Sequence, residues 1–183
     1  MMVKRLFSVV FIGFIAVTVA CSGSSDGGVI TGPAVGATFI PEEINPPPET
    51  VSMAQSTVSG DRVTVAVNIT DTSGIFGAAF DVAYDASLAS FETWSPGTIL
   101  EQGGNAPNYV VNSTQPGHLI IGISRTGNVS TVSATGTQPL LRLTFRVLQA
   151  GAAPVSFTNK ALTNDLVDPL PRVVWFGGAL AGS

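Results

Sequence analysis

Short runs in which apolar residues alternate with polar or small ones constrain the fold of this chain more than any other feature. From 63 to 69, Val, Val, Val and Ile alternate with Thr, Ala and Asn, and from 141 to 147 the same spacing returns. A period of two buries one side of a β-strand and exposes the other. Further strands are expected at 75–84, 88–94, 109–111, 118–124, 155–157 and 173–180. No window of a dozen residues has helical apolar spacing.

Eight or nine short strands separated by turn residues predict an all-β chain, folded as an antiparallel β-sandwich. Some 130 residues take part, which is enough to bury a self-sufficient core. Its large side chains are expected to be Phe80, Phe91, Trp94, Phe145, Phe157 and Phe176.

The N-terminus has the form of an export signal, with Lys4 and Arg5 ahead of an uncharged run, 6–20. Fifteen such residues are fewer than the roughly 20 needed to span a bilayer. The ending Thr-Val-Ala before Cys21 resembles a bacterial lipobox, which predicts a signal peptide at 1–20 and lipid on Cys21. Ser22 after the cysteine favours the outer membrane or cell surface, with the rest of the chain exported. The alternative is an ordinary secretory signal followed by an incidental cysteine.

Residues 21–50 have no hydrophobic periodicity and are rich in Gly and Ser, then in Pro. Such a segment predicts a tether between the lipid and the folded part. The only hint of order in it is the run Ala37-Thr38-Phe39-Ile40. The folded domain is therefore expected to span 51–183.

Charge and composition exclude several classes of function. The chain carries 8 basic and 12 acidic side chains, one His and one Cys. Loss of 1–20 removes two of the basic ones, which leaves six against twelve and makes nucleic acid an unsuitable partner. A single Cys and a single His cannot build a zinc site. We expect no cofactor and no metal site.

Few residues of the chain are suited to catalysis, so no enzyme is expected. His118 with Ser124 and Asp85 would form a triad only by chance, since no G-x-S-x-G motif is present. Glu92 and Glu101 are among the few acids of the predicted domain that a glycosidase pair could use. Surface solvation is the simpler role for both.

Two binding alternatives remain open at this point. Asn164, Asp165 and Asp168 cluster in one loop, where oxygen ligands for Ca²⁺ could gather, although an Asx turn explains them equally. Trp94 and Trp175 could stack on sugars, which would make the domain a carbohydrate-binding module that binds polysaccharide directly. Both tryptophans, however, occupy alternating strands and are expected in the core.

Four stretches in order resemble the cohesin domain. They are the opening G-D-x-V-x-V of 58–69, the segment GIFGAAFDVAYDASL of 74–88, the Gly-Thr and strand of 136–147, and the closing 163–178. The resemblance covers the whole predicted domain. It implies a jelly roll of about nine strands that performs no catalysis and binds the dockerin module of another protein, often for polysaccharide degradation or surface assembly.

The resemblance also places the partner-binding face on the strands at 75–84 and 119–124. With Phe80 and Val82 turned inward, the residues expected on that face are Gly77, Ala79, Asp81, Ala83, Gly122, Ser124 and Arg125. Type I cohesins have Asn and Asp where this chain has Gly77 and Ala79, so their dockerin contact is not expected here. Asp81 and Arg125 are the only charges left to orient a partner.

Overall fold

The structure is a computed structural model that describes residues 36–183. The predicted signal peptide 1–20, the predicted lipidation site Cys21 and the predicted tether up to residue 35 lie outside the described residues. Within 36–183, no helix has the length and apolar character needed to cross a membrane.

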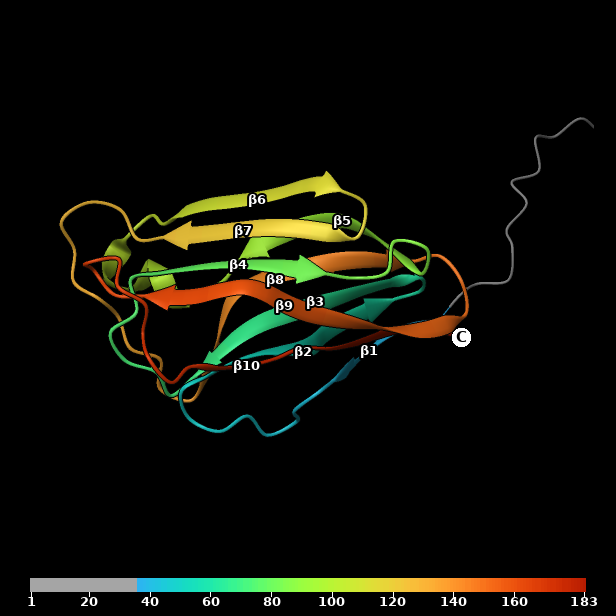
Figure 1. Cartoon of the computed structure of the whole chain (residues 1–183), viewed down its shortest axis with the longest axis horizontal. Coiled ribbons are helices and arrows are strands. Elements are labelled where there is room, and N and C mark those ends of the chain that lie inside the picture. The colour runs from blue at the N-terminus through green and yellow to red at the C-terminus, as the bar shows by residue number, and fades with distance from the viewer. Residues whose placement is uncertain (1–35) are drawn as a thin grey trace, which may run out of the picture. The chain divides into compact units, whose positions relative to one another are not determined.

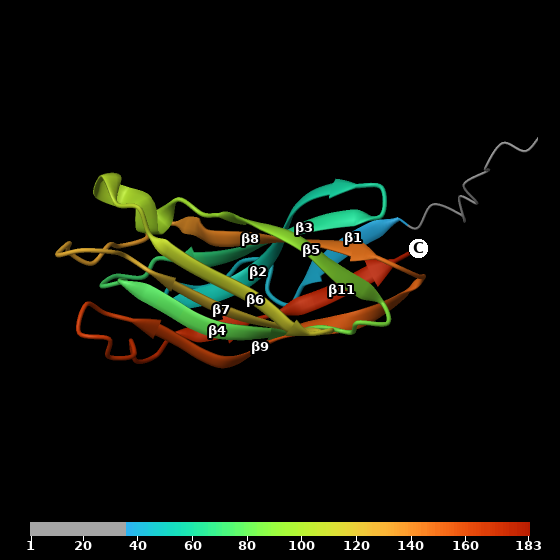
Figure 2. The ribbon, with the colours of Figure 1, turned by 90° about the horizontal axis from the view of Figure 1, so that it is seen from above.

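Eleven strands form two sheets that pack face to face (Figures 1 and 2). The six-stranded sheet has the order β1 (Ala37–Pro41), β11 (Gly178–Gly182), β9 (Gly151–Thr163), β4 (Gly77–Ala83), β7 (His118–Ser124) and β6 (Asn108–Gln115). The five-stranded sheet has the order β10 (Val174–Phe176), β2 (Thr50–Ser59), β3 (Arg62–Thr70), β8 (Thr137–Val147) and β5 (Ala89–Pro96). One 3₁₀ segment, η1, covers Ile99–Gly104. All neighbouring strands are antiparallel except β10 and β2. The predicted all-β sandwich is confirmed.

The core lies between the sheets and is filled by the inward-facing residues of both. Phe80 and Phe145 are fully buried, and Phe157 is almost so. Phe91 and Trp94 are half-buried and pack against the core. The expectation for Phe176 is wrong, because its neighbour Trp175 is the residue that packs inward.

Trp175 is placed in the core by the pairing of β10 with β2. It lies opposite Val51, which is fully buried, so Phe176 must point the other way. The indole ring is 5.5 Å from the ring of Phe80 and 5.0 Å from that of Phe157.

The folded domain begins before Val51, so the predicted tether of 21–50 ends too late. Strand β1 pairs with β11, and both Ala37 and Phe39 are buried. The side-chain Oε1 of Gln55 on β2 also accepts hydrogen bonds from the hydroxyl of Thr38 and the N–H of Phe39, at 2.9 and 2.8 Å. Strand β1 has only five residues and lies in a proline-rich segment, so its apolar alternation was too short to predict that it pairs with a distant strand.

The strand expected at 173–180 is two strands, which belong to different sheets. The chain crosses between them at Gly177, where the backbone lies against the carbonyl of Val155 so closely that a Cβ would overlap it. Glu42 fixes the crossing from the other side. Its Oε2 accepts from the N–H of Gly177 at 2.8 Å, and its own N–H donates to the carbonyl of Gly177 at 3.1 Å.

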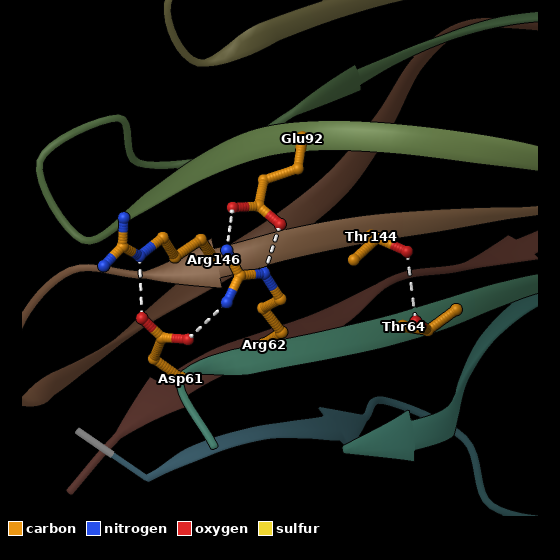
Figure 3. Close-up of polar contacts among 6 residues, drawn as sticks. All are labelled: Asp61, Arg62, Thr64, Glu92, Thr144 and Arg146. Atoms are coloured by element: carbon orange, nitrogen blue, oxygen red, sulfur yellow. Dashed lines mark hydrogen bonds and ion pairs between the residues drawn. The ribbon is translucent and has the colours of Figure 1, made fainter. Parts of the chain in front are cut away.

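The outer face of the five-stranded sheet carries a network of charged side chains (Figure 3). Nε and Nη2 of Arg62 donate to the two carboxylate oxygens of Glu92, at 2.7 and 3.0 Å. Asp61 accepts from Arg62 at 3.1 Å and from Nε of Arg146 at 2.7 Å. All four side chains are at least a quarter exposed. Glu92, one of the two acids considered for glycoside hydrolysis, is therefore a member of a surface ion-pair network.

Replacement of Gly177 by alanine is expected to destabilise the fold. The added methyl group would overlap the Val155 carbonyl and force the crossing strand away from β9, a distortion that costs about 1–3 kcal/mol in unfolding free energy. Urea denaturation of Gly177→Ala against the parent chain measures this. The matched control is Gly122→Ala, where the nearest atom to the new methyl group is the Cβ of Val110 at 4.0 Å. Equal stability of the two variants would contradict the proposed close approach.

The ion-pair network predicts a loss of stability in acid. The hydrogen bond from Arg146, with the charges of both arginines, lowers the pKa of Asp61 below its usual value. A carboxyl whose pKa is lowered by folding stabilises the protein above its unfolded pKa of about 3.9 and loses that contribution as the pH falls through the folded pKa. The melting temperature of Asp61→Asn should therefore lie below the parent's at pH 7, and the difference should shrink as the pH falls through the lowered pKa of Asp61. A constant difference from pH 7 to pH 2 would count against this.

Candidate functional site

The outer surface of strands β6, β7, β4 and β9, hereafter the open face, carries most of the predicted partner-binding residues. Figure 1 shows these four strands side by side. On β4 the side chains of Ala78, Phe80 and Val82 point into the core, which turns the alternate residues outward. The structure thus brings together on one face Gly77, Ala79, Asp81, Ala83, Gly122 and Ser124.

Strand pairing puts the smallest of these residues next to one another. Gly77 lies opposite Ser124, and Ala79 lies between Gly122 on β7 and Ala161 on β9. Ala79 is exposed and Gly122 is half-buried, whereas Gly77 is buried. The central strands are therefore accessible at Ala79 and Gly122. The sheet therefore offers a floor on which a partner can approach closely.

A shallow groove of about 270 Å³ runs over this floor. Its two apolar walls are Val110 on β6, which is 52% exposed, and Val167 in the loop after β9, which is 74% exposed. Asn108, Ser124 and Thr163 add polar groups at its rim. Neither Val110 nor Val167 was expected from the sequence, where both lie outside the two strands that the resemblance singled out.

Asp81 lies on the open face, but its carboxylate is already engaged within the sheet. Its Oδ2 accepts a hydrogen bond of 2.6 Å from Nδ2 of Asn159 and lies 3.3 Å from Nε2 of His118. Asn159 reaches Asp81 because β9 bulges there, with two residues opposite Phe80 alone and a φ of 47° at Asn159. Asp81 itself is only 8% exposed. Asp81 is therefore part of a satisfied polar cluster, and sequence reasoning missed both of its partners.

The prediction that Arg125 belongs to the open face is wrong. Alternation along β7 turns Ser124 outward and the following residue inward, and Arg125 is 6% exposed. Its Nη1 donates to the carbonyl of Leu100 at 2.7 Å, and its Nη2 donates to that of Gln102 at 2.9 Å. The guanidinium thus holds η1 against the end of β7.

No catalytic arrangement is assembled from the residues considered for chemistry. His118 and Ser124 occupy opposite ends of β7, which are about 20 Å apart at 3.3 Å per residue. The Oδ1 of Asp85 accepts from both the N–H and the hydroxyl of Ser87, and these hydrogen bonds lower the pKa of Asp85. Asp85 is a turn residue.

The loop considered for calcium is organised by its own backbone. The side-chain oxygen of Asn164 accepts from the N–H groups of Leu166 and Asp168, both at 2.9 Å, as in an Asx turn. Among the residues that the structure describes, no three His, Cys, Asp or Glu side chains converge as metal ligands.

Both tryptophans are half-buried and pack against other aromatic rings. Trp94 lies 5.2 Å from the ring of Tyr109, and Trp175 lies within the cluster of Phe80 and Phe157. Neither residue lines the groove on the open face.

Comparison with known proteins gives the same fold. The solved structures that resemble this one include the cohesin CaCohA2 from Clostridium acetobutylicum, at 21% identity over 69% of this chain and 86% of that chain, with a TM-score of 0.54. A type II cohesin A11 from Bacteroides cellulosolvens shares 16% identity over 72% and 98%, with a TM-score of 0.57. A non-cellulosomal cohesin from the archaeon Archaeoglobus fulgidus shares 15% over 78% and 88%, with a TM-score of 0.51.

The search of curated proteins finds no match to this sequence. The family model of the cohesin domain, in contrast, matches residues 50–174, which is well over half of the chain. The chain therefore belongs to the cohesin domain family, as the sequence motifs predicted.

Proposed function

We propose that this chain is a non-catalytic lipoprotein of the cell envelope, whose cohesin domain binds a dockerin-type module of another exported protein on the open face. The observation that carries the proposal is the floor of Gly77, Ala79 and Gly122 beneath an apolar groove. The setting expected from the family is polysaccharide degradation or the assembly of surface proteins.

Relatives of this fold support a dockerin as the partner. The sixth cohesin from the scaffoldin B of Acetivibrio cellulolyticus, at 21% identity and a TM-score of 0.52, is described in complex with a Cel5 dockerin. CaCohA2 is likewise described in a complex with CaDoc0917. These partners are properties of those proteins, and the proposal transfers only the class of partner to this chain.

The size of the open face limits how a partner can sit. The seven residues of β4 and of β7 set a length of about 23 Å, and the four strands set a width of about 19 Å. This flat area is roughly half of the 800 Å² that a specific interface buries on each side. The partner must therefore also contact the rims. Leu166 and Val167 are suited to this, because they are 75% and 74% exposed and Val167 lines the groove.

Anchoring to the membrane through lipid on Cys21 is the second part of the proposal. It rests on the sequence alone, on the basic start, the apolar run and the lipobox-like ending of 1–20. A lipid anchor followed by a tether would present the open face at a distance from the membrane. Acyl chains bind a membrane through about 0.8 kcal/mol per buried methylene group, and several on one cysteine hold a protein firmly.

Bulky charges on the floor are expected to abolish docking. In Ala79→Arg with Gly122→Arg, two guanidinium groups would fill the groove and hold the partner off the sheet. The chain from residue 22 onward, used as bait for the exported proteins of its own host, should recover a dockerin-bearing protein with the parent sequence. In a titration with that recombinant dockerin, the double variant should bind at least about 30-fold more weakly, or about 2 kcal/mol.

The control is Thr57→Arg, an exposed position on β2 in the opposite sheet. It adds the same side chain away from the open face and should leave binding unchanged. Equal losses in both variants, or recovery of no dockerin-bearing protein by the parent chain, would contradict docking on the open face.

Replacement of Cys21 by serine is expected to release the protein from the membrane. Without the thiol no acyl chain can be attached, so Cys21→Ser should appear in the soluble exported fraction and incorporate no labelled palmitate. The parent chain should fractionate with membranes and carry the label. A parent chain that carries no label would show an ordinary secretory signal.

A further inference from the structure

Arg125 is a buried cation that lacks a counter-ion. Among residues 36–183, the ion pairs within 4.0 Å involve Arg62, Arg146 and His118, and none involves Arg125. A buried charge is costly unless it is paired and fully hydrogen-bonded. Two backbone carbonyls, of Leu100 and Gln102, are the acceptors that the guanidinium has.

One edge of this guanidinium remains unused. Nε of Arg125 is the one buried side-chain polar atom of the described residues that has no hydrogen-bond partner. A guanidinium has five N–H donors, and Nη2 has a second hydrogen beside the one given to Gln102. In Arg62, the same two nitrogens, Nε and Nη2, hold both oxygens of Glu92. The free edge of Arg125 is thus the edge that this protein uses elsewhere to bind a carboxylate.

Arg125 also lines a hollow at the end of the sandwich, with a volume of about 570 Å³. It is the only charged residue in the lining, and the hydroxyl and amide groups around it add neutral donors. These polar side chains are Gln102, Asn128, Ser130, Thr131 and Ser133.

The segment that follows Arg125 and lines the hollow with it makes few hydrogen bonds. Thr126 is fixed by hydrogen bonds with Asn105 and Ala106, and Val132 pairs with Ile75. Between them, residues 127–131 make no hydrogen bond to any other described residue. Nε of Arg125 is closed to solvent at present, so a ligand reaches it only when the lining of the hollow moves, and residues 128–131 are part of that lining.

We propose that the hollow around Arg125 is a binding site for a carboxylate. One carboxylate oxygen accepts from Nε and the other from Nη2, and the hydroxyls of the rim take the remaining lone pairs. A carboxylate can accept from Nε and Nη2 with two separate oxygens, so the site should prefer it over chloride, which offers a single acceptor atom. The site is separate from the groove on the open face and does not depend on docking there.

An NMR titration of the chain from residue 22 onward tests the proposal. The signal of the Arg125 Nε–H, assigned by its loss in Arg125→Lys, should shift saturably with sodium acetate, with a Kd on the order of 1–10 mM. Sodium chloride at the same ionic strength should leave it unmoved. A peptide with one Asp between capped glycines, bound at least tenfold more tightly than acetate, would identify a protein side chain as the source. Equal affinity of the two would identify a free small carboxylate.

A tethered carboxylate provides the second test, which holds even if Arg125→Lys fails to fold. Ser130→Asp places an acid in the lining of the hollow and should abolish the acetate response while raising the melting temperature. Thr57→Asp, with the same charge on the opposite sheet, should do neither. An Nε–H signal that ignores acetate, that responds equally to chloride, or that responds to acetate unchanged in Ser130→Asp would overturn the proposal.

Discussion

The contact of Phe80 with Trp175 is the interaction on which the rest of the domain depends. Phe80 belongs to β4 in the six-stranded sheet, and Trp175 belongs to β10 in the five-stranded sheet, so their rings join the two layers. Burial of Phe80 determines which residues of β4 face the core and which face outward. Because neighbours in a strand point to opposite sides, Ala79 and Asp81 must then face outward. The open face is thus a consequence of how the core is packed.

The bulge in β9 shows how a polar group is accommodated on that face. The carboxylate of Asp81 faces outward on a central strand, between Ala79 and Ala83 and opposite Ile120, where it would be partly desolvated without a partner. The extra residue in β9 turns the amide of Asn159 onto Asp81, and His118 approaches from the neighbouring strand β7. A left-handed φ at Asn159 costs little, since Asn tolerates that region better than most residues. The cluster therefore makes Asp81 a fixed part of the surface.

Local alternation predicted most of the fold, and the errors fall where pairing between distant segments decides. The strand at 118–124 was predicted with the observed bounds, since its period of two is unbroken. The choice between Trp175 and Phe176 depended on the register with β2, which no local pattern contains. Arg125 is a different case. Continuing the alternation past Ser124 turns it inward, although the resemblance led us to expect it on the binding face. The carbonyls of Leu100 and Gln102 in η1 explain its burial.

The two outer faces of the sandwich differ in character, since one carries a charged network and the other carries small and apolar side chains. On the five-stranded sheet, two arginines and two acids neutralise one another in pairs across β3, β8 and β5. On the open face, Asp81 is internally paired, and the large apolar side chains exposed on its strands are Ile120 on β7 and Val110 on the edge strand β6. A partner would meet few unpaired charges there, so the recognition that this surface can offer depends on shape and close approach. The groove supplies both, because the small residues Gly77, Ala79 and Gly122 form its base and the larger Val110 and Val167 form its sides.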